Sequence, residues 1–363
     1  MLINGKRALA YTATVSEVVP IGGADNIELI KVNGWNVISK KGELNVGNTC
    51  VFFEIDSKLP EAPWSEFLRT RNFKVKTMNL SKFNVISQGL ALPLKHFKEI
   101  DIPNENGVDV TELLNVTYIE EEDNIRKAEP KKKSKNFLMR FSWYRKLFRG
   151  SWDYSFPSFV KKTDEERIEN MPGLLKDNEA KYIVTEKLDG TSCTYAMERK
   201  LFGYKFYVCS RNRCIPKSDK QNGGIYWELE KKYNIKHKLK EMLKRSRDVR
   251  YVYIQGEGVG NIQGNPLKLK ENDLYIFNLV SDKYGKLDGV SGAIFVKTCG
   301  LKWVPVLGIA PLPSTMEEMK KMADGMSAIN PEVKREGLVF RTSDSSVSFK
   351  NVSREYLLSK KGK

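Results

Sequence analysis

Short runs of β-branched and aromatic residues, separated by Gly, Pro and Asn, dominate the chain from residue 7 to about residue 114. The pattern predicts strands over residues 8–19, 27–32, 35–38, 50–55 and 90–94. Several short strands with turn residues between them are typical of a small β-barrel or sandwich. We therefore predict an N-terminal β-domain over residues 1–118.

The pattern changes at residue 119. Acidic residues at 120–123 precede three lysines at 131–133 and a basic, aromatic stretch over residues 137–149. Charge runs of this kind predict a solvated linker, here residues 119–150. Its basic half fits either a helix on a membrane surface or a phosphate-binding segment, and the rest of the chain favours phosphate. From residue 151 to residue 363, mixed strands and one long helix over residues 224–244 predict a second domain and an α+β protein.

Composition narrows the class of protein. At 363 residues the chain is long enough for two domains with separate cores, and its net charge of +16 favours a polyanionic partner such as nucleic acid. Two histidines in unrelated surroundings exclude a His-based triad or zinc site. Five cysteines without paired spacing indicate reduced thiols. No apolar run is long enough to span a bilayer, so we expect a soluble, cytoplasmic protein without a membrane partner.

The stretch over residues 182–195 places an amine at the end of a predicted strand. A β-branched run leads into Lys187-Leu188-Asp189-Gly190, and a second short run follows. Taken alone, Asp-Gly is a common β-turn pair, so the tetrapeptide also has a plain structural interpretation. The same four residues recur at 286–289, after a polar loop with its own glycine and with too little chain behind them for the rest of a catalytic domain. We predict a hairpin turn there and a functional lysine at Lys187.

An ordered series of short motifs distinguishes the first copy from the second. The motifs are SRN at 210–212, QGEG at 255–258, IFNL at 276–279, REGLVF at 335–340 and SFK at 348–350. With the approach over residues 156–167, the series resembles motifs I, Ia, III, IIIa, IV and V of the covalent nucleotidyltransferases, the class of polynucleotide ligases and mRNA capping enzymes. Residues 24–51 resemble OB-type modules. The closest resemblance, over nearly the whole chain, is to RNA ligases in which an OB-like β-barrel precedes a nucleotidyltransferase domain of antiparallel sheets with flanking helices.

The resemblance implies a role for each motif. Lys187 would attack the α-phosphorus of ATP, expel pyrophosphate and form a lysyl-AMP; the AMP would pass to an RNA 5′-phosphate, from which a 3′-hydroxyl would displace it. The implied nucleotide-binding residues are Glu186, Asp189 and Gly190 beside the lysine, Arg211 and Lys350 on phosphates, Glu257 on the ribose hydroxyls and Phe277 against adenine. Glu336 and Asp189 would help to bind a metal. Because its neighbours in the sequence are apolar, Phe277 also fits a second interpretation, in which it is an ordinary core residue of a strand.

A lysine nucleophile must lose its proton before it can attack phosphorus. Lowering its pKa by about three units from about 10.4 requires on the order of 4 kcal/mol. Carboxylates such as Glu186 and Asp189 act in the opposite direction. A divalent cation bound through carboxylates and waters reverses the local charge, so we expect Mg²⁺ or Mn²⁺ beside ATP.

One position departs from the family pattern. Motif V often has a second lysine two residues before the one that corresponds to Lys350, and this chain has Ser348 there. Lys334, Arg335 and Arg341 are the candidates for supplying the missing positive charge.

The order of the domains selects among the members of this class. DNA ligases and capping enzymes usually carry their OB domain after motif V, whereas here only residues 351–363 follow Lys350. We therefore expect an ATP-dependent RNA ligase that joins 3′-hydroxyl and 5′-phosphate RNA ends as a monomer, at nicks in duplexes, in RNA repair. Broken strand ends and RNA/DNA hybrids stay open as substrates. The alternatives are a GTP-dependent mRNA capping guanylyltransferase and an OB-type RNA-binding protein with an inactive transferase domain.

Overall fold

The computed structural model describes residues 1–3, 6–119, 156–177, 179–217 and 224–360. Its N-terminal part contains the following strands and 3₁₀ helices: β1 (Leu2–Ile3), β2 (Lys6–Arg7), β3 (Ala10–Pro20), β4 (Ile27–Val32), β5 (Trp35–Lys40), β6 (Thr49–Phe53), β7 (Ser57–Lys58), η1 (Glu66–Arg71), β8 (Met78–Leu80), η2 (Ser81–Phe83), β9 (Val85–Ser87), β10 (Leu90–Pro93), η3 (Leu94–Phe97) and β11 (Thr117–Tyr118). The predicted strands are confirmed, with ends shifted by a few residues.

A five-stranded antiparallel sheet in the order β10-β6-β3-β4-β5 forms this N-terminal domain. The register of β3 shifts between Val15 and Glu17, and the strand passes there from pairing with β6 to pairing with β4. Alternate residues of β6 enter two separate apolar clusters, Phe52 with Trp35 and Phe53 with Phe97, because successive side chains of a strand point to opposite faces. The sheet is therefore buried on both faces along β6.

The second part of the chain contains two more sheets and five α-helices within the described residues. Its elements are β12 (Glu166–Arg167), η5 (Ile168–Asn170), η6 (Pro172–Lys176), β13 (Tyr182–Lys187), β14 (Thr191–Arg199), β15 (Tyr204–Cys209), α2 (Gly224–Tyr233), α3 (Ile235–Arg245), β16 (Tyr251–Val259), β17 (Asp273–Ser281), β18 (Gly285–Lys286), α4 (Gly289–Thr298), β19 (Lys302–Trp303), β20 (Val306–Ala310), α5 (Met316–Ala323), β21 (Gly337–Arg341), β22 (Ser348–Val352) and α6 (Arg354–Ser359). The predicted α+β class is confirmed.

The two sheets of this part have separate cores. One has the strand order β12-β22-β21-β13-β20, and Met319 of α5 packs on it beside Phe340 and Phe349. The other has the order β15-β14-β16-β17-β18, with β19 beside β17, and α2 and α3 pack on it through Leu229 and Leu239. Strands β13 and β14 are consecutive but belong to different sheets, so the turn between them, residues 188–190, joins the two.

The prediction of one helix over residues 224–244 is wrong. Helix α2 ends at Tyr233 and α3 begins at Ile235, because Asn234 between them has a left-handed backbone with φ of 50°. Asparagine visits this conformation more readily than most residues, but a helix cannot continue through it. The break lets α2 and α3 pack separately on the sheet.

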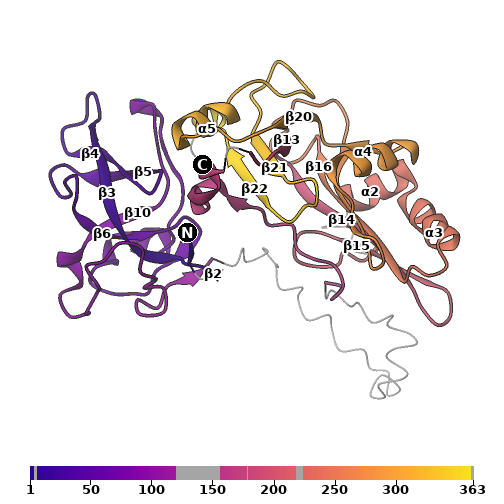
Figure 1. The fold of residues 1–363 in the computed structure, drawn as a ribbon, viewed down its shortest axis with the longest axis horizontal. Coiled ribbons are helices and arrows are strands. Elements are labelled where there is room, and N and C mark those ends of the chain that lie inside the picture. Colours follow the sequence, from indigo (N-terminus) through magenta and orange to yellow (C-terminus); the bar gives the residue numbers. More distant parts are fainter. Residues whose placement is uncertain (4–5, 120–155, 178, 218–223, 361–363) are drawn as a thin grey trace, which may run out of the picture.

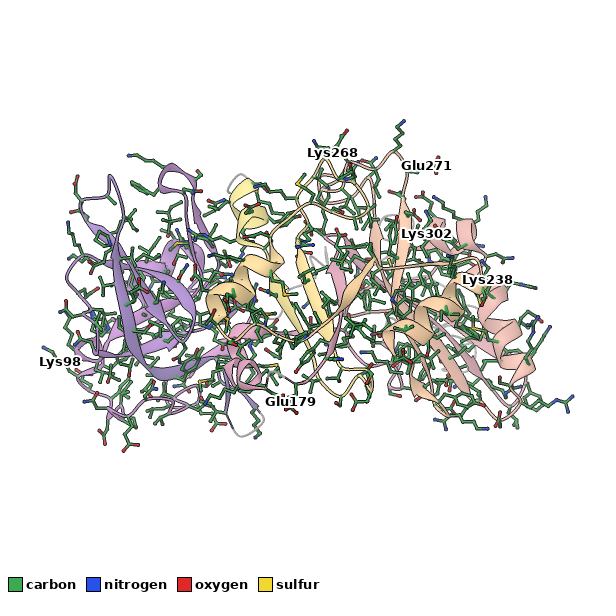
Figure 2. All side chains as sticks on the ribbon, turned by 45° about the horizontal axis from the view of Figure 1, so that its top comes forward. Lys98, Glu179, Lys238, Lys268, Glu271 and Lys302 are labelled. Atoms are coloured by element: carbon green, nitrogen blue, oxygen red, sulfur yellow. The ribbon has the colours of Figure 1, made fainter. Side chains whose placement is uncertain are left out.

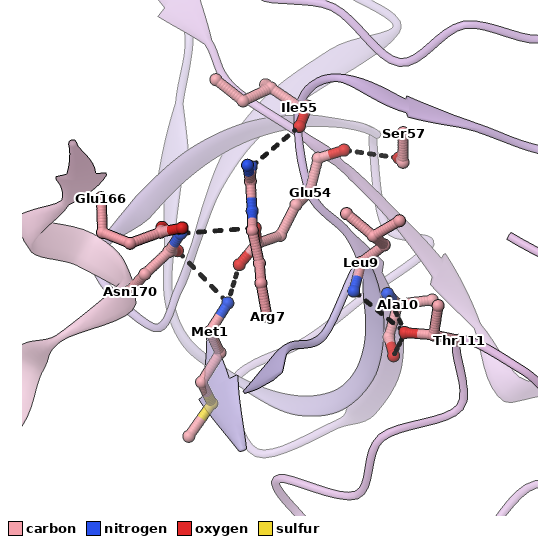
Figure 3. A network of polar contacts seen from close by, with 10 residues as sticks. All are labelled: Met1, Arg7, Leu9, Ala10, Glu54, Ile55, Ser57, Thr111, Glu166 and Asn170. Atoms are coloured by element: carbon pink, nitrogen blue, oxygen red, sulfur yellow. Dashed lines mark hydrogen bonds and ion pairs between the residues drawn. The ribbon is translucent and has the colours of Figure 1, made fainter. Parts of the chain in front are cut away.

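The N-terminal domain lies beside the second part of the chain (Figure 1), and buried polar groups connect the two (Figure 3). The Glu54 carboxylate, which is 0% exposed, accepts a hydrogen bond from Arg7 Nε at 2.8 Å and pairs with the amino group of Met1. Asn170 of η5 lies across the junction, with its Nδ2 3.4 Å from the same carboxylate and its Oδ1 3.3 Å from the Met1 amine. The expected linker, residues 119–150, lies outside the described residues except for Ile119.

Charged side chains such as Lys98, Lys238 and Lys268 project from the periphery of the molecule (Figure 2). Among the described residues, no helix combines the length and the apolar character needed to cross a membrane.

Candidate active site

A cavity of about 500 Å³ lies where the two sheets of the second part meet. Its lining includes all the residues expected to act on a nucleotide: Glu186, Lys187, Asp189, Gly190, Arg211, Glu257, Phe277, Glu336 and Lys350. They come from β13, the turn after it, the turn after β15, and strands β16, β17 and β22, with Glu336 directly before β21. Residues more than 160 positions apart in the sequence therefore share one site.

Lys187 is the last residue of β13, and its neighbour across the sheet is Gly337 at the start of β21. This register places Glu336 beside the lysine, and Lys187 Nζ lies 2.6 Å from Glu336 Oε2. Burial acts to lower the pKa of Lys187, but the charge and hydrogen bond of Glu336 outweigh it and raise the pKa. The ammonium ion is therefore stabilised in the nucleotide-free protein.

Glycines allow the close approach of strands around Lys187. A Cβ atom at Gly190 would lie 2.3 Å from the Gly258 carbonyl oxygen, and one at Gly337 would lie 2.2 Å from the Asn351 carbonyl oxygen. Side chains at these positions would force the strands apart. Both glycines therefore bring the residues beside them, Asp189 and Glu336, into the cavity.

Acidic groups are concentrated on the side of the cavity next to Lys187. Burial raises the pKa of Glu257 to about 8; the charge of Lys187 opposes this shift, and the charges of Glu336 and Asp189 add to it. Glu186 is buried, its Oε2 accepts a hydrogen bond from the Ala328 amide at 2.7 Å, and its Oε1 has no partner among the described residues.

A divalent cation fits this lining, because it would compensate carboxylates that repel one another. Glu336 and Asp189, the residues expected to bind a metal, both line the cavity. Among the described residues, no three or more Cys, His, Asp or Glu side chains form a ready-made metal site.

Cationic groups line the cavity near the same lysine. Burial, followed by the charges of Arg167 and Lys187, lowers the pKa of Lys350 to about 8. Arg211 forms an ion pair with Asp164. A cation that is buried among other cations is stabilised by an anion, which a nucleotide phosphate supplies.

Arg341 is the best placed of the three candidates for the base missing at Ser348. It lines the cavity, and its Nε donates a hydrogen bond to Ser348 Oγ at 3.2 Å. Its other contacts are with the Phe277 carbonyl oxygen at 2.7 Å and Glu165 Oε1 at 2.8 Å. The guanidinium also lies 5.8 Å from the centre of the Phe277 ring. The two other candidates face elsewhere: Lys334 pairs with Glu355, and Arg335 donates to carbonyl oxygens of residues 322–324.

The second Lys-Leu-Asp-Gly copy does not reach the cavity. The prediction that it forms a hairpin turn is wrong in detail, because the turn precedes it and Lys286 already belongs to β18. Asp288 is the N-cap of α4 and accepts hydrogen bonds from the amides of Val290 and Ser291, each at 2.9 Å. Its aspartate therefore begins a helix.

Two residues outside the cavity lining contact Asp189 of the site and were not predicted from the sequence. Tyr356 of α6 donates a hydrogen bond to Asp189 Oδ2, and Lys360 Nζ lies 2.6 Å from the same oxygen. Neither residue belongs to a recognised motif. Nothing in the sequence of this basic C-terminal segment indicates that it contacts a turn about 170 residues earlier.

Known proteins match both parts of the chain. A family model for an OB-fold domain matches residues 9–94, and the RNA ligase family model matches residues 180–354. The structure resembles that of Naegleria gruberi RNA ligase with PPi, at 33% identity, 97% coverage of this chain, 98% of the other and a TM-score of 0.71. Two variants of that ligase, one with ATP and Mn and one with AMP and Mn, each match at 33% identity and a TM-score of 0.72, over 96% and 97% of this chain and 98% of each of theirs. A search of curated proteins finds no match.

The chain belongs to the RNA ligase family. The prediction of an OB fold followed by a nucleotidyltransferase domain is confirmed.

Proposed function

We propose that the protein is an ATP-dependent RNA ligase that joins 3′-hydroxyl and 5′-phosphate RNA ends at nicks in duplexes, as a monomer, in RNA repair in the cytoplasm. The observation that carries the proposal is the single cavity in which Lys187, Arg211 and Lys350 converge with an acidic cluster. The family relationship and the structures of a similar ligase with ATP, AMP, PPi and Mn support the choice of nucleotide and the use of a divalent metal, Mg²⁺ or Mn²⁺.

The reaction begins when Lys187 Nζ, as a neutral amine, attacks the α-phosphorus of ATP. Pyrophosphate leaves and a phosphoramidate bond forms between Nζ and AMP. Arg211 and Lys350 hold phosphate oxygens, and Phe277 stacks on the base; these roles are supported by the position of all three residues in the cavity lining. A divalent cation held by Glu336 and Asp189 would supply positive charge beside the α-phosphate and Lys187.

Two further displacements complete the joining of RNA. The 5′-phosphate of one strand attacks the lysyl-AMP phosphorus and takes the AMP, which leaves Lys187 free. The 3′-hydroxyl of the other strand then attacks the activated 5′-phosphate, and AMP departs. A phosphodiester bond replaces the phosphoanhydride bond, and the net consumption is one ATP per joint.

The proposal is tested with labelled nucleotides and defined duplexes. Incubation with α-labelled ATP and Mg²⁺ or Mn²⁺ should label the protein, and addition of nicked duplex RNA should discharge the label and yield a sealed strand. Labelling by GTP and not by ATP would indicate a capping enzyme. Absence of labelling by either nucleotide would indicate an inactive transferase domain. Nicked DNA and RNA/DNA duplexes, and single-stranded ends, measured in parallel, define which strand must be RNA.

A further inference from the structure

The C-terminal helix α6 contacts Asp189 of the cavity on one side and the N-terminal domain on the other. Ser353 begins the helix: its hydroxyl accepts a hydrogen bond from the Tyr356 amide and donates one to Asp324 Oδ1 at 2.7 Å. Tyr356 is buried. The first turn of α6 is therefore anchored on the second part of the chain.

On the cavity side, both donors from this region converge on one oxygen atom. Tyr356 Oη and Lys360 Nζ both contact Asp189 Oδ2, and the Asp189 side chain is 14% exposed while Lys360 is 52% exposed. Asp189 follows Lys187 by two residues, in the turn between β13 and β14. Any shift of its carboxylate therefore moves a negative charge close to the lysine.

On the opposite side, one residue of the N-terminal domain binds the end of the helix. Asn79 of β8 has its Nδ2 atom 2.9 Å from the Leu357 carbonyl oxygen, 3.2 Å from that of Leu358 and 2.9 Å from that of Lys360. The last carbonyl groups of a helix lack partners within the helix, so a side-chain amide that binds several of them stabilises the end. Asn79 thus fixes the segment that carries Lys360.

We propose that Tyr356 and Lys360 are positioning residues for the adenylylation of Lys187, that they act by holding Asp189, and that Asn79 links the N-terminal domain to this contact. The proposal rests on the proposed function, because the step that they support is the attack of Lys187 on ATP. None of the three residues needs to touch the reacting atoms. They affect Lys187 only by fixing the position of the Asp189 carboxylate.

The consequence for Lys187 is geometric. The hydrogen bond from Tyr356 and the ion pair with Lys360 hold the Asp189 carboxylate in one place. Loss of either contact would release this carboxylate and loosen the turn that follows Lys187.

The first test compares variants at Lys360 in single-turnover adenylylation with ATP, using the full chain. Lys360→Met keeps the length of the side chain and removes its charge, and should slow adenylylation about threefold, since the pair is half exposed. Lys360→Arg should restore the rate. Lys297→Met removes an exposed lysine from α4 and is the matched control, which should not change it. A Lys360→Arg protein as slow as Lys360→Met would overturn the role of the charge.

The second test removes the hydrogen bonds on either side of α6. Tyr356→Phe should slow adenylylation about tenfold, and Asn79→Ala between about 3- and 10-fold, because each loses donors to groups that stay partly buried. Asn104→Ala, at an exposed asparagine of the N-terminal domain, is the control. Thermal unfolding midpoints within a few degrees of the parent confirm that each variant is folded.

Failure of this inference is distinct from failure of the proposed function. If the parent protein is not labelled by ATP, the proposed function is wrong. If the parent is labelled and the Tyr356, Lys360 and Asn79 variants all react at its rate, α6 has no part in adenylylation. If only Asn79→Ala reacts at that rate, the link to the N-terminal domain is refuted.

Discussion

The chain contains two copies of Lys-Leu-Asp-Gly whose environments differ completely. Lys187 of the first copy ends a strand of one sheet and opens onto the cavity, where Glu336 pairs with it. Lys286 of the second copy lies in β18 of the other sheet, outside that cavity, and Asp288 begins a helix. Four identical residues thus line a cavity in one place and contribute to a strand and a helix cap in the other.

A lysine nucleophile is expected to have a lowered pKa, but here the pKa is lowered at Lys286 and raised at Lys187. Burial and the charge of Arg341 lower the pKa of Lys286 to about 8, whereas Glu336 raises that of Lys187. A neutral amine therefore forms more readily at the lysine that lies outside the cavity lining. The comparison teaches that perturbed pKa values mark a reactive lysine only together with groups that hold its substrate.

The largest expected difference comes from removing each lysine. Lys187→Met should reduce protein labelling by ATP at least about 10³-fold, as expected for loss of a covalent nucleophile. Lys286→Met keeps the apolar stem of the side chain and should leave the rate within about twofold of the parent. The measurement is single-turnover labelling with α-labelled ATP. A Lys187→Met protein that labels normally would contradict the assignment.

The next effect concerns positive charge around the first copy. Lys350→Ala should slow adenylylation about 10²- to 10³-fold, since a preorganised cation at developing phosphate charge is removed. Ser348→Ala should cost less than about fivefold, because it removes one neutral hydrogen bond to Arg341. Ser348→Lys adds a cation, which should lower the pKa of Lys187 and shift the pH profile of adenylylation to lower pH. If Lys350→Ala and Ser348→Ala slow adenylylation equally, the loss of positive charge is not the cause.

A further contrast is the pH at which each lysine reacts in the absence of nucleotide. In acetylation with acetic anhydride, followed by mass spectrometry of peptides, Lys286 should react with a midpoint near pH 8, and Lys187 only above its ordinary pKa of 10.5. Glu336→Gln removes the charge that raises the pKa of Lys187, so the Lys187 profile should move to lower pH while that of Lys286 stays. An unchanged Lys187 profile in Glu336→Gln would refute the ion pair as the cause.

The smallest effect separates the two aspartates. Asp288→Ala removes a helix N-cap and should lower the free energy of unfolding by about 1 kcal/mol, with no change in adenylylation. Asp189→Asn weakens the contacts with Tyr356 and Lys360 and should slow adenylylation whatever its effect on stability. Chemical denaturation combined with the labelling assay measures both properties. If the Asp288→Ala protein is fully folded and still adenylylates more slowly than the parent, the second copy does contribute to the site.

Much of the molecule follows from local sequence patterns. Alternation of apolar residues predicts the strands of the N-terminal domain, and the motif series predicts the lining of the cavity. Local patterns do not show that Asn234 divides one helical stretch into α2 and α3, because asparagine is compatible with a helix as well as with the left-handed conformation. They also do not reveal Tyr356 and Lys360 at Asp189, because that contact depends on how a distant helix packs.

The assignment of Lys187 is tested most directly by locating AMP on the protein. The full chain is incubated with ATP and a divalent metal, digested, and analysed by tandem mass spectrometry under conditions that preserve the phosphoramidate bond. We predict one AMP per protein on Lys187, in the peptide that contains residues 182–195, and none on Lys286. AMP on Lys286, or on any lysine outside the cavity, would contradict the central claim.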